Sequence, residues 1–245
     1  MIPIYDAAPR ARRPLVVLGL IAINFAVFLW MSEMPERNLN WVLEHFALIP
    51  VRYSDPRAAM AAGLDPNNYW PLLTNAFLHG GWLHIILNMW SLWIFGPAME
   101  GRCGRLGFLI LYVAGAVAAS ATHLVAYWTS SEPALGASGA IAAVIAAYAV
   151  TYPRAQVILL VPILFLPLFI PVSALFFAVF WFAAQILQGT QALFAHSMGT
   201  DIAWWAHIGG FLFGIVFAKI ANALVLGRNI ETRQWSGTVP RIPRR

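Results

Sequence analysis

The sequence has 245 residues, of which 60% are hydrophobic and only 10% are charged, whereas about 25% of the residues of a soluble domain are charged. This composition excludes an ordinary water-soluble fold and predicts a membrane protein. The formal charge of +5 rests on fourteen arginines and one lysine. In a membrane chain these residues indicate topology and contact with the lipid bilayer, and they give no sign of nucleic-acid binding.

Residues 1–13 are a short polar arm rich in arginine and proline. Six apolar segments follow, with the composition of membrane-spanning helices. The expected spans are 14–31, 81–99, 106–128, 137–152, 171–188 and 202–225. The predicted fold class is therefore an all-α membrane protein, a bundle of six transmembrane helices over residues 14–226, followed by a basic tail over 227–245.

Two connecting segments are too long for bare loops. Residues 32–69 mix charges with aromatic residues, which predicts an interfacial first loop with short amphipathic helices. Residues 155–170 are apolar but contain Pro162 and Pro167, so a surface-lying or extended segment is expected there. Asp201 precedes the last span, where an acidic residue suits a helix N-cap.

The fourth predicted helix is short. Sixteen residues rise about 24 Å, less than the roughly 30 Å of hydrocarbon in a bilayer. Because Pro153 and Arg154 fix one end at the surface, the other end, with Ser138, must lie below the opposite surface. Irregular backbone at that depth requires a neighbouring protein surface or a water-filled cavity. The loop before Ser138 is therefore expected to dip into a wet pocket.

Basic residues predict the orientation of the bundle. With six spans, the arginines of the arm, of the short loops and of the tail fall on one side, and the loops 129–137 and 189–201 carry none. The positive-inside rule then places both termini in the cytoplasm, in a multi-pass protein of the cell (inner) membrane.

Four polar residues interrupt these apolar spans at one expected depth: Ser138, His84, Asn88 and His207. His84 and Asn88 are four residues apart, so they share one helix face. Small residues recur every fourth position in the fourth and sixth spans, which allows two helices to approach closely in a membrane. They are Gly139, Ala143, Ala147, Ala206, Gly210, Gly214 and Ala218.

This set of residues predicts nucleophilic catalysis. A neutral His207 can accept the proton of Ser138 as the hydroxyl attacks a carbonyl, and then return it to the leaving amine. The backbone N–H of Ser138, the amide of Asn88 and the ring of His84 can stabilise the oxyanion. Asp201 lies about 240° from His207 around the helix, so the prediction is a Ser-His dyad without a carboxylate or a cofactor.

Four motifs, in this order, resemble those of the rhomboid intramembrane serine proteases over about residues 14–226. The motifs are His84-x-x-x-Asn88, Glu100-x-Arg102, Gly136-x-Ser138-Gly139 and Ala206-His207-x-x-Gly210-x-x-x-Gly214. The resemblance implies a nucleophilic Ser138, a basic His207, and an oxyanion and substrate-binding site that includes His84, Asn88, Gly136 and Gly139. It also implies that Glu100 and Arg102 brace the loop between the second and third helices, and that the fifth helix helps to form a lateral gate.

The sequence departs from the family pattern at two places. Some rhomboids carry an aromatic residue one turn after the nucleophile that stacks on the histidine; here that position is Ala142, so His207 must be braced by another residue. Many carry Trp-Arg in the first loop, where this chain has Trp70 and Pro71. These departures concern gating and loop anchoring and leave the predicted dyad intact.

Other interpretations remain open. His207 can be a hydrogen-bonding strut between helices, and His84 and Asn88 can satisfy loop carbonyls. A metal is not expected, because no third strong ligand lies at the same depth. The leading hypothesis is an endopeptidase that cleaves single-span or polytopic membrane proteins near the outer leaflet. The alternative is a rhomboid-like pseudoprotease that binds membrane clients without cleavage, and a channel is disfavoured by the apolar half of the fourth helix.

Overall fold

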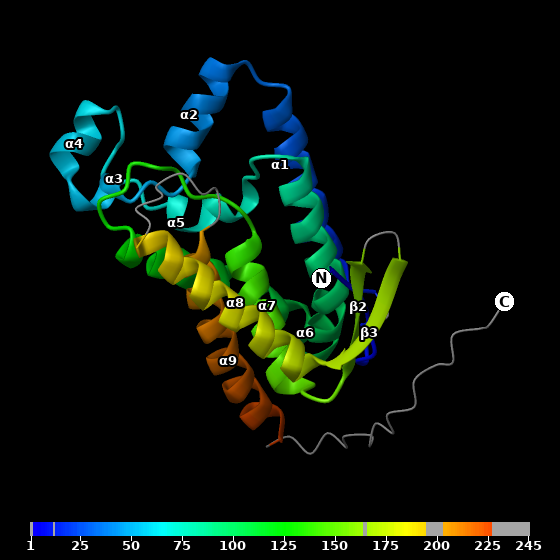
Figure 1. The fold of residues 1–245 in the computed structure, drawn as a ribbon. Helices are drawn as coiled ribbons and strands as arrows, with labels where there is room; N and C mark the ends of the chain where they lie inside the picture. Colours follow the sequence, from blue (N-terminus) through cyan, green and yellow to red (C-terminus); the bar gives the residue numbers. More distant parts are fainter. Residues whose placement is uncertain (1, 12, 164–165, 195–202, 227–245) are drawn as a thin grey trace.

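The computed structural model describes residues 2–11, 13–163, 166–194 and 203–226 and is mostly helical (Figure 1). The predicted N-cap Asp201 and the tail 227–245 lie outside the described residues. The elements in chain order are β1 (Ile2–Asp6), α1 (Leu15–Ser32), α2 (Glu36–Phe46), α3 (Val51–Ser54), α4 (Pro56–Ala61), α5 (Pro71–Thr74), the 3-10 helix η1 (Asn75–Phe77), α6 (Trp82–Ala126), α7 (Ser138–Thr151), β2 (Gln156–Ile163), β3 (Leu166–Ser173), α8 (Ala174–Phe194) and α9 (Trp204–Leu226).

Three of the described helices are long and apolar enough to cross a membrane: α1, α6 and α9. Two shorter apolar helices accompany them, the 14-residue α7 and the Ala174–Gln188 part of α8. The multi-pass membrane character predicted from composition is thus supported. The number of spans stays a prediction at this point.

Helix α6 is two antiparallel segments joined at Gly104. Gly104 has φ 72° and ψ 171°, which is not helical and suits a residue without a Cβ. The amide nitrogen of Asn75, before the start of α6, lies 2.8 Å from the hydroxyl oxygen of Ser120, in its second half. The chain therefore reverses within α6, where the sequence predicted two separate helices.

The N-terminus of α1 is stabilised by a distant carboxylate. Pro14 precedes the helix and provides no side-chain cap. Glu100, buried at 3% exposure, accepts hydrogen bonds from the backbone N–H groups of Val16 at 3.2 Å and Val17 at 2.9 Å. An acceptor with negative charge satisfies the free N–H groups and the positive end of the helix dipole. This contact fixes α1 against the reversal in α6.

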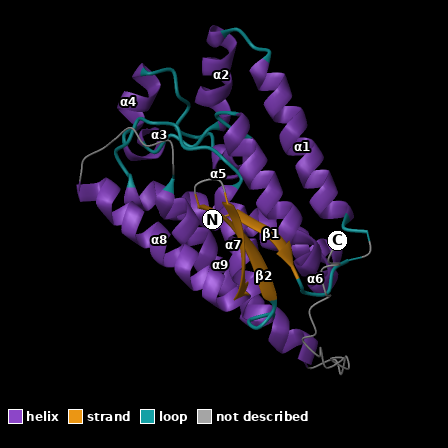
Figure 2. Cartoon of the chain, turned by 45° about the vertical axis from the view of Figure 1, so that its right-hand side comes forward, coloured by secondary structure: helices purple, strands orange, loops and turns teal. Residues whose placement is uncertain are grey.

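A three-stranded antiparallel sheet corrects the all-α prediction. Its strand order is β1-β2-β3, and Figure 2 shows the strands beside the helices. Residues 155–170, which were expected to be surface-lying or extended, contribute to the hairpin of β2 and β3, in which Pro162 pairs with Pro167. These prolines fit because β3 is an edge strand and β1 pairs β2 only as far as Leu160. Proline therefore excluded a helix here without excluding a strand.

The first strand also differs from the expected polar arm. Asp6 is buried and accepts hydrogen bonds from the N–H of Ala8 at 2.9 Å, from the guanidinium of Arg10 at 2.7 Å and from the hydroxyl of Tyr148 at 3.3 Å. Burial raises the pKa of this carboxyl despite the nearby Arg10. Because Tyr148 belongs to α7, these bonds join the strand to the helix that begins at Ser138.

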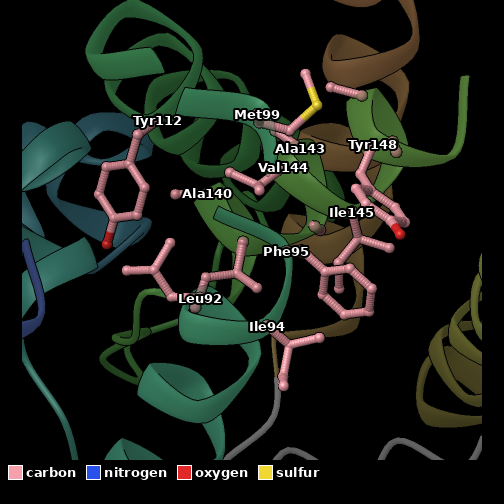
Figure 3. Close-up of a cluster of buried hydrophobic side chains, with 14 of the residues drawn as sticks. Leu92, Ile94, Phe95, Met99, Tyr112, Ala140, Ala143, Val144, Ile145 and Tyr148 are labelled. Atoms are coloured by element: carbon pink, nitrogen blue, oxygen red, sulfur yellow. The ribbon is translucent and has the colours of Figure 1, made fainter. Parts of the chain in front are cut away.

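The core lies where α7 packs against the first half of α6. Its side chains converge in Figure 3, with the ring of Phe95 5.1 Å from that of Tyr148 and 5.5 Å from that of Phe177 in α8. Every residue of α7 from Gly139 to Ala149 is buried. A helix enclosed on all sides can hold its first residue, Ser138, in a fixed position.

Short helices make up the first loop, as predicted. Helices α2 to α5 gather at the end of the bundle where α7 and α9 begin (Figure 1). Leu48 and Ala134 exchange two backbone hydrogen bonds, at 3.0 and 2.8 Å, which join this region to the loop before Ser138. Buried Arg52 bonds the carbonyls of Asp65 and Glu44. These contacts anchor the loop while Trp70 stays exposed.

Candidate active site

Ser138 and His207 meet where two helices begin. Ser138 is the first residue of α7, and His207 lies in the first turn of α9, which starts at Trp204. The Oγ atom of Ser138 is 2.7 Å from Nε2 of His207, a hydrogen-bond distance. His207 is buried. Two residues 69 positions apart in the sequence are thus paired, as the predicted dyad requires.

The close approach of α7 and α9 depends on glycines. A Cβ built on Gly210 would overlap the carbonyl oxygen of Gly139, and one built on Gly214 would overlap the carbonyl oxygen of Ala143. A Cβ on Gly139 would lie 3.4 Å from the carbonyl oxygen of Ala206. The expectation that small residues allow these helices to approach is therefore confirmed for this pair.

His84 lies near Ser138, beside Gly136. Gly136 has φ 127°, and a Cβ there would be 2.7 Å from Nε2 of His84 and 3.7 Å from the Oγ of Ser138. Gly136 therefore leaves room for the imidazole ring beside the serine. It also adopts a backbone conformation that L side chains rarely take.

Asn88 follows His84 by one turn of α6 and is buried. Its side-chain nitrogen has no hydrogen-bond partner within the described part of the chain. No hydrogen bond joins Asn88 to Ser138 among the same residues. A buried amide donor without a partner is costly, and a developing oxyanion is one acceptor that would satisfy it. The catalytic role of Asn88 stays a prediction.

His79 lies just before α6, close to His84. The two rings are 5.0 Å apart in an edge-to-face arrangement. His79 is 2% exposed, and burial, followed by the charge on His84, lowers the pKa of its imidazole to about 4. His79 is therefore neutral at physiological pH.

The residue that braces His207 was not identified from the sequence. The Nδ1 atom of His207 lies 2.6 Å from Oε1 of Gln185 in α8, and the ring of Trp181 lies 5.7 Å from the imidazole. Trp181 and Gln185 are four residues apart and so share a helix face. Trp204 adds an edge-to-face contact at 6.0 Å. Gln185 could have been singled out in the sequence, because a polar residue within an apolar span indicates a partner or a function.

Glu100 and Arg102, which the resemblance implied as braces of the loop between the second and third helices, form hydrogen bonds with α1 and α9. Glu100 caps α1, and a guanidinium nitrogen of Arg102 lies 3.1 Å from the side-chain oxygen of Asn222 in α9. The pair therefore connects the reversal in α6 to α1 and to α9.

A pocket adjoins Ser138. Polar groups of Asn75, Ser120, His123 and Ser138 line it, with backbone from the loop around Gly136. Across the described residues, no cluster of three or more His, Cys, Asp or Glu side chains is placed to hold a metal ion.

Several curated proteins are similar to this chain. RHOMBOID-like protein 12, mitochondrial, of Arabidopsis thaliana is 29% identical over 84% of the chain and 58% of its own length. The human Presenilin-associated rhomboid-like protein, mitochondrial, is 29% identical over 85% of the chain and 49% of its length. A zebrafish (Danio rerio) relative, Presenilin-associated rhomboid-like protein A, mitochondrial, is 31% identical over 85% of the chain and 48% of its length. The chain spans about half the length of these relatives.

These relatives contradict one prediction. The basic residues indicated a cell membrane with both termini in the cytoplasm, whereas the relatives are named as mitochondrial proteins. The positive-inside count separates the two sides of a membrane but carries no information on which membrane it is. The predicted cell-membrane location is therefore wrong, and the multi-pass membrane character stands.

A family model described as the Rhomboid domain matches residues 66–223. This stretch is more than half of the chain and contains His84, Asn88, Ser138, Gln185 and His207. The motif order read from the sequence and the relatives' names agree with the match. The chain belongs to the rhomboid family.

Proposed function

We propose that this chain is an intramembrane serine endopeptidase in which Ser138 is the nucleophile and His207 the general base. The observation that carries the proposal is the 2.7 Å hydrogen bond between Ser138 Oγ and His207 Nε2. Rhomboid proteins are generally serine proteases of this kind, and the chain belongs to that family. The reaction is hydrolysis of a peptide bond in another membrane protein.

The proposed reaction begins when His207 Nε2 accepts the proton of the Ser138 hydroxyl as Oγ attacks the scissile carbonyl carbon. The carbonyl oxygen becomes an oxyanion. The N–H of Ser138 at the N-terminus of α7 and the unpaired amide nitrogen of Asn88 are suitable donors for it, and His84 flanks the same position.

The second half of the proposed reaction returns the proton from His207 to the leaving amine as the carbon–nitrogen bond breaks. An acyl ester on Ser138 remains. Water then attacks this ester, with His207 again accepting the proton, and releases the carboxylate product and the free serine. The pocket lined by Asn75, Ser120 and His123 is a polar space beside the ester where a water molecule can be held.

The substrates we propose are single-span or polytopic membrane proteins. The bundle is taken to cross the bilayer six times, through α1, the two halves of α6, α7, α8 and α9. Helix α7 spans about 21 Å for its 14 residues, less than a bilayer's hydrocarbon, so cleavage is expected below the surface on the side of α2 to α5. Helix-weakening residues near the cut favour cleavage, because a helix hides its carbonyls. The relatives' names favour a mitochondrial membrane.

The test is cleavage of a model single-span substrate by the purified chain in liposomes. Ser138→Ala is expected to abolish both the cleavage of the substrate and the labelling of the chain by a fluorophosphonate probe. The matched control is Ser91→Ala, since among the described residues the hydroxyl of Ser91 bonds the carbonyl of Leu87 within the same helix, at 2.8 Å, and no other group. Undiminished cleavage by Ser138→Ala overturns the proposal. Client binding with neither cleavage nor labelling by the unaltered chain identifies a pseudoprotease instead.

A further inference from the structure

We propose that Gln185 of α8 is a positioning residue for His207, accepting a hydrogen bond from Nδ1–H so that Nε2 presents its lone pair to the Ser138 hydroxyl. The inference rests on the proposed function and extends it to a third side chain. Gln185 acts through His207 and does not touch the reacting atoms.

The hydrogen-bond directions are mutually consistent. A neutral imidazole carries one N–H and one lone pair. If Nε2 accepts the serine proton across 2.7 Å, the ring proton is on Nδ1. The atom 2.6 Å from Nδ1 is the amide oxygen of Gln185, which can only accept. The glutamine thus selects the one neutral tautomer in which His207 is a base towards Ser138.

The position of Gln185 in α8 explains its rigidity. Ala178, Trp181 and Phe182 precede it at helical spacing and form with it the face of α8 that meets α9, where the rings of Phe182 and Phe211 stack at 4.4 Å. Gln185 is 6% exposed within this stripe. A buried amide without hydrogen bonds costs several kcal/mol in an apolar environment, so the bond to His207 is favourable for both side chains.

The aromatic neighbours of His207 cannot accept a hydrogen bond from Nδ1–H as Gln185 does. Trp181 and Trp204 contact the imidazole at 5.7 and 6.0 Å and restrict its tilt. Neither ring offers an acceptor to Nδ1, because the indole nitrogen is a donor only. Ring contacts alone would leave the imidazole free to exchange the roles of its two nitrogens. Gln185 removes that freedom.

The decisive variants are Gln185→Met, which keeps the shape but removes the acceptor, and Gln185→Glu, which keeps an acceptor oxygen at the same reach. The matched control is Gln188→Met, since Gln188 lies three residues further along α8 and, among the described residues, its side chain bonds the carbonyl of Ala184 at 3.1 Å and no other group. Each is measured in liposomes for kcat, KM and fluorophosphonate labelling, and for melting temperature.

Gln185→Met is expected to lower kcat and the labelling rate about 100-fold, within the range of general-base effects, with KM changed less than about threefold. Gln185→Glu is expected to stay within about tenfold of the unaltered chain, and Gln188→Met to match it. Gln185→Met with unaltered kcat overturns the inference. Equal losses in both Gln185 variants overturn it as well, because a purely structural role would not be restored by a carboxylate.

A second readout does not depend on activity. Nitrogen-15 NMR of labelled histidine, with His207 assigned by comparison with a His207→Ala sample, is expected to show protonated Nδ1 in the unaltered chain and a mixture of tautomers in Gln185→Met. An unchanged tautomer in that variant overturns the inference, even if the variant folds poorly enough to lose activity. Retained cleavage in Ser138→Ala would instead defeat the proposed function, so the two failures are distinguishable.

Discussion

Replacing Gly210 by alanine tests how closely α7 and α9 must pack to align the site. A Cβ on Gly210 would occupy the position of the Gly139 carbonyl oxygen. Since this carbonyl is backbone in a buried helix, no side-chain rotation can make room. The two helices must separate, and they carry Ser138 and His207 one and three residues from the point of contact.

The size of the effect follows from the geometry. Carbon and oxygen atoms in contact need about 3.5 Å, so the helices are expected to move apart by on the order of 1 Å. Overpacking of this kind costs about 1–3 kcal/mol of stability. A displacement of 1 Å can lower the rate of a positioned reaction about 100-fold. The 2.7 Å bond between Ser138 and His207 leaves little tolerance for such a shift.

The assay is cleavage of a single-span substrate in liposomes together with a thermal melt in detergent. Gly210→Ala is expected to lose about 100-fold in turnover and to melt at a lower temperature. The control is Gly19→Ala in α1, where no described atom outside the adjoining turns of the same helix lies within 4 Å of the added Cβ. This change is expected to be neutral or slightly stabilising, because alanine favours helix over glycine by about 1 kcal/mol. Wild-type turnover and melting in Gly210→Ala would refute the reasoning.

Three further predictions concern the surroundings of the site. The imidazole of His79 has a folded-state pKa of about 4 against an ordinary 6.5. The unfolded state therefore binds more protons between these pH values, and the free energy of unfolding falls as the pH drops through that window. His79→Phe is expected to remove this loss, which is on the order of 3 kcal/mol, as measured by thermal melts over a series of pH values. Glu100→Gln replaces one of the two accepting carboxylate oxygens by an amide NH2, so either Val16 or Val17 loses its acceptor and the negative charge is removed. It is expected to lower the unfolding free energy by about 1 kcal/mol, read from detergent melts. Gly136→Ala strains a backbone at φ 127° and crowds His84, so fluorophosphonate labelling of Ser138 is expected to fall at least about tenfold.

The pairing of Ser138 with His207 could be predicted because membrane spans restrict what polar residues do. A histidine in an apolar span is expensive, so its presence alone indicates a partner or a function. The four-residue spacing of small residues from Gly139 to Ala147 in one span and from Ala206 to Ala218 in another then indicated which helices meet. Both signals are local in sequence, and the structure places both groups of residues at one interface.

The sheet could not be predicted, because its strands lack a local sequence pattern and pair with residues far away in the chain. Residues 156–163 are apolar on both faces, so they lack the alternation that marks a half-exposed strand. The partner of Val157 is Asp6, about 150 positions earlier. Asp6 in turn is stabilised by Tyr148, which no pattern within the first arm can reveal. The arm was therefore interpreted as polar chain although it forms a strand.

The contacts of His207 explain why Gln185 could not be found from the sequence motifs. The family position that can stack on the histidine lies on α7, and here it is Ala142, which has no ring to offer. One ring contact comes from Trp181 and the hydrogen bond from Gln185, both on α8, and a second ring contact comes from Trp204 of α9 itself. Because α8 supplies the hydrogen bond, the orientation of His207 depends on how α8 packs against α9, while its distance to Ser138 depends on how α9 packs against α7. A change that loosens α8 is therefore expected to misorient the imidazole of His207 while leaving α7 and α9 in contact.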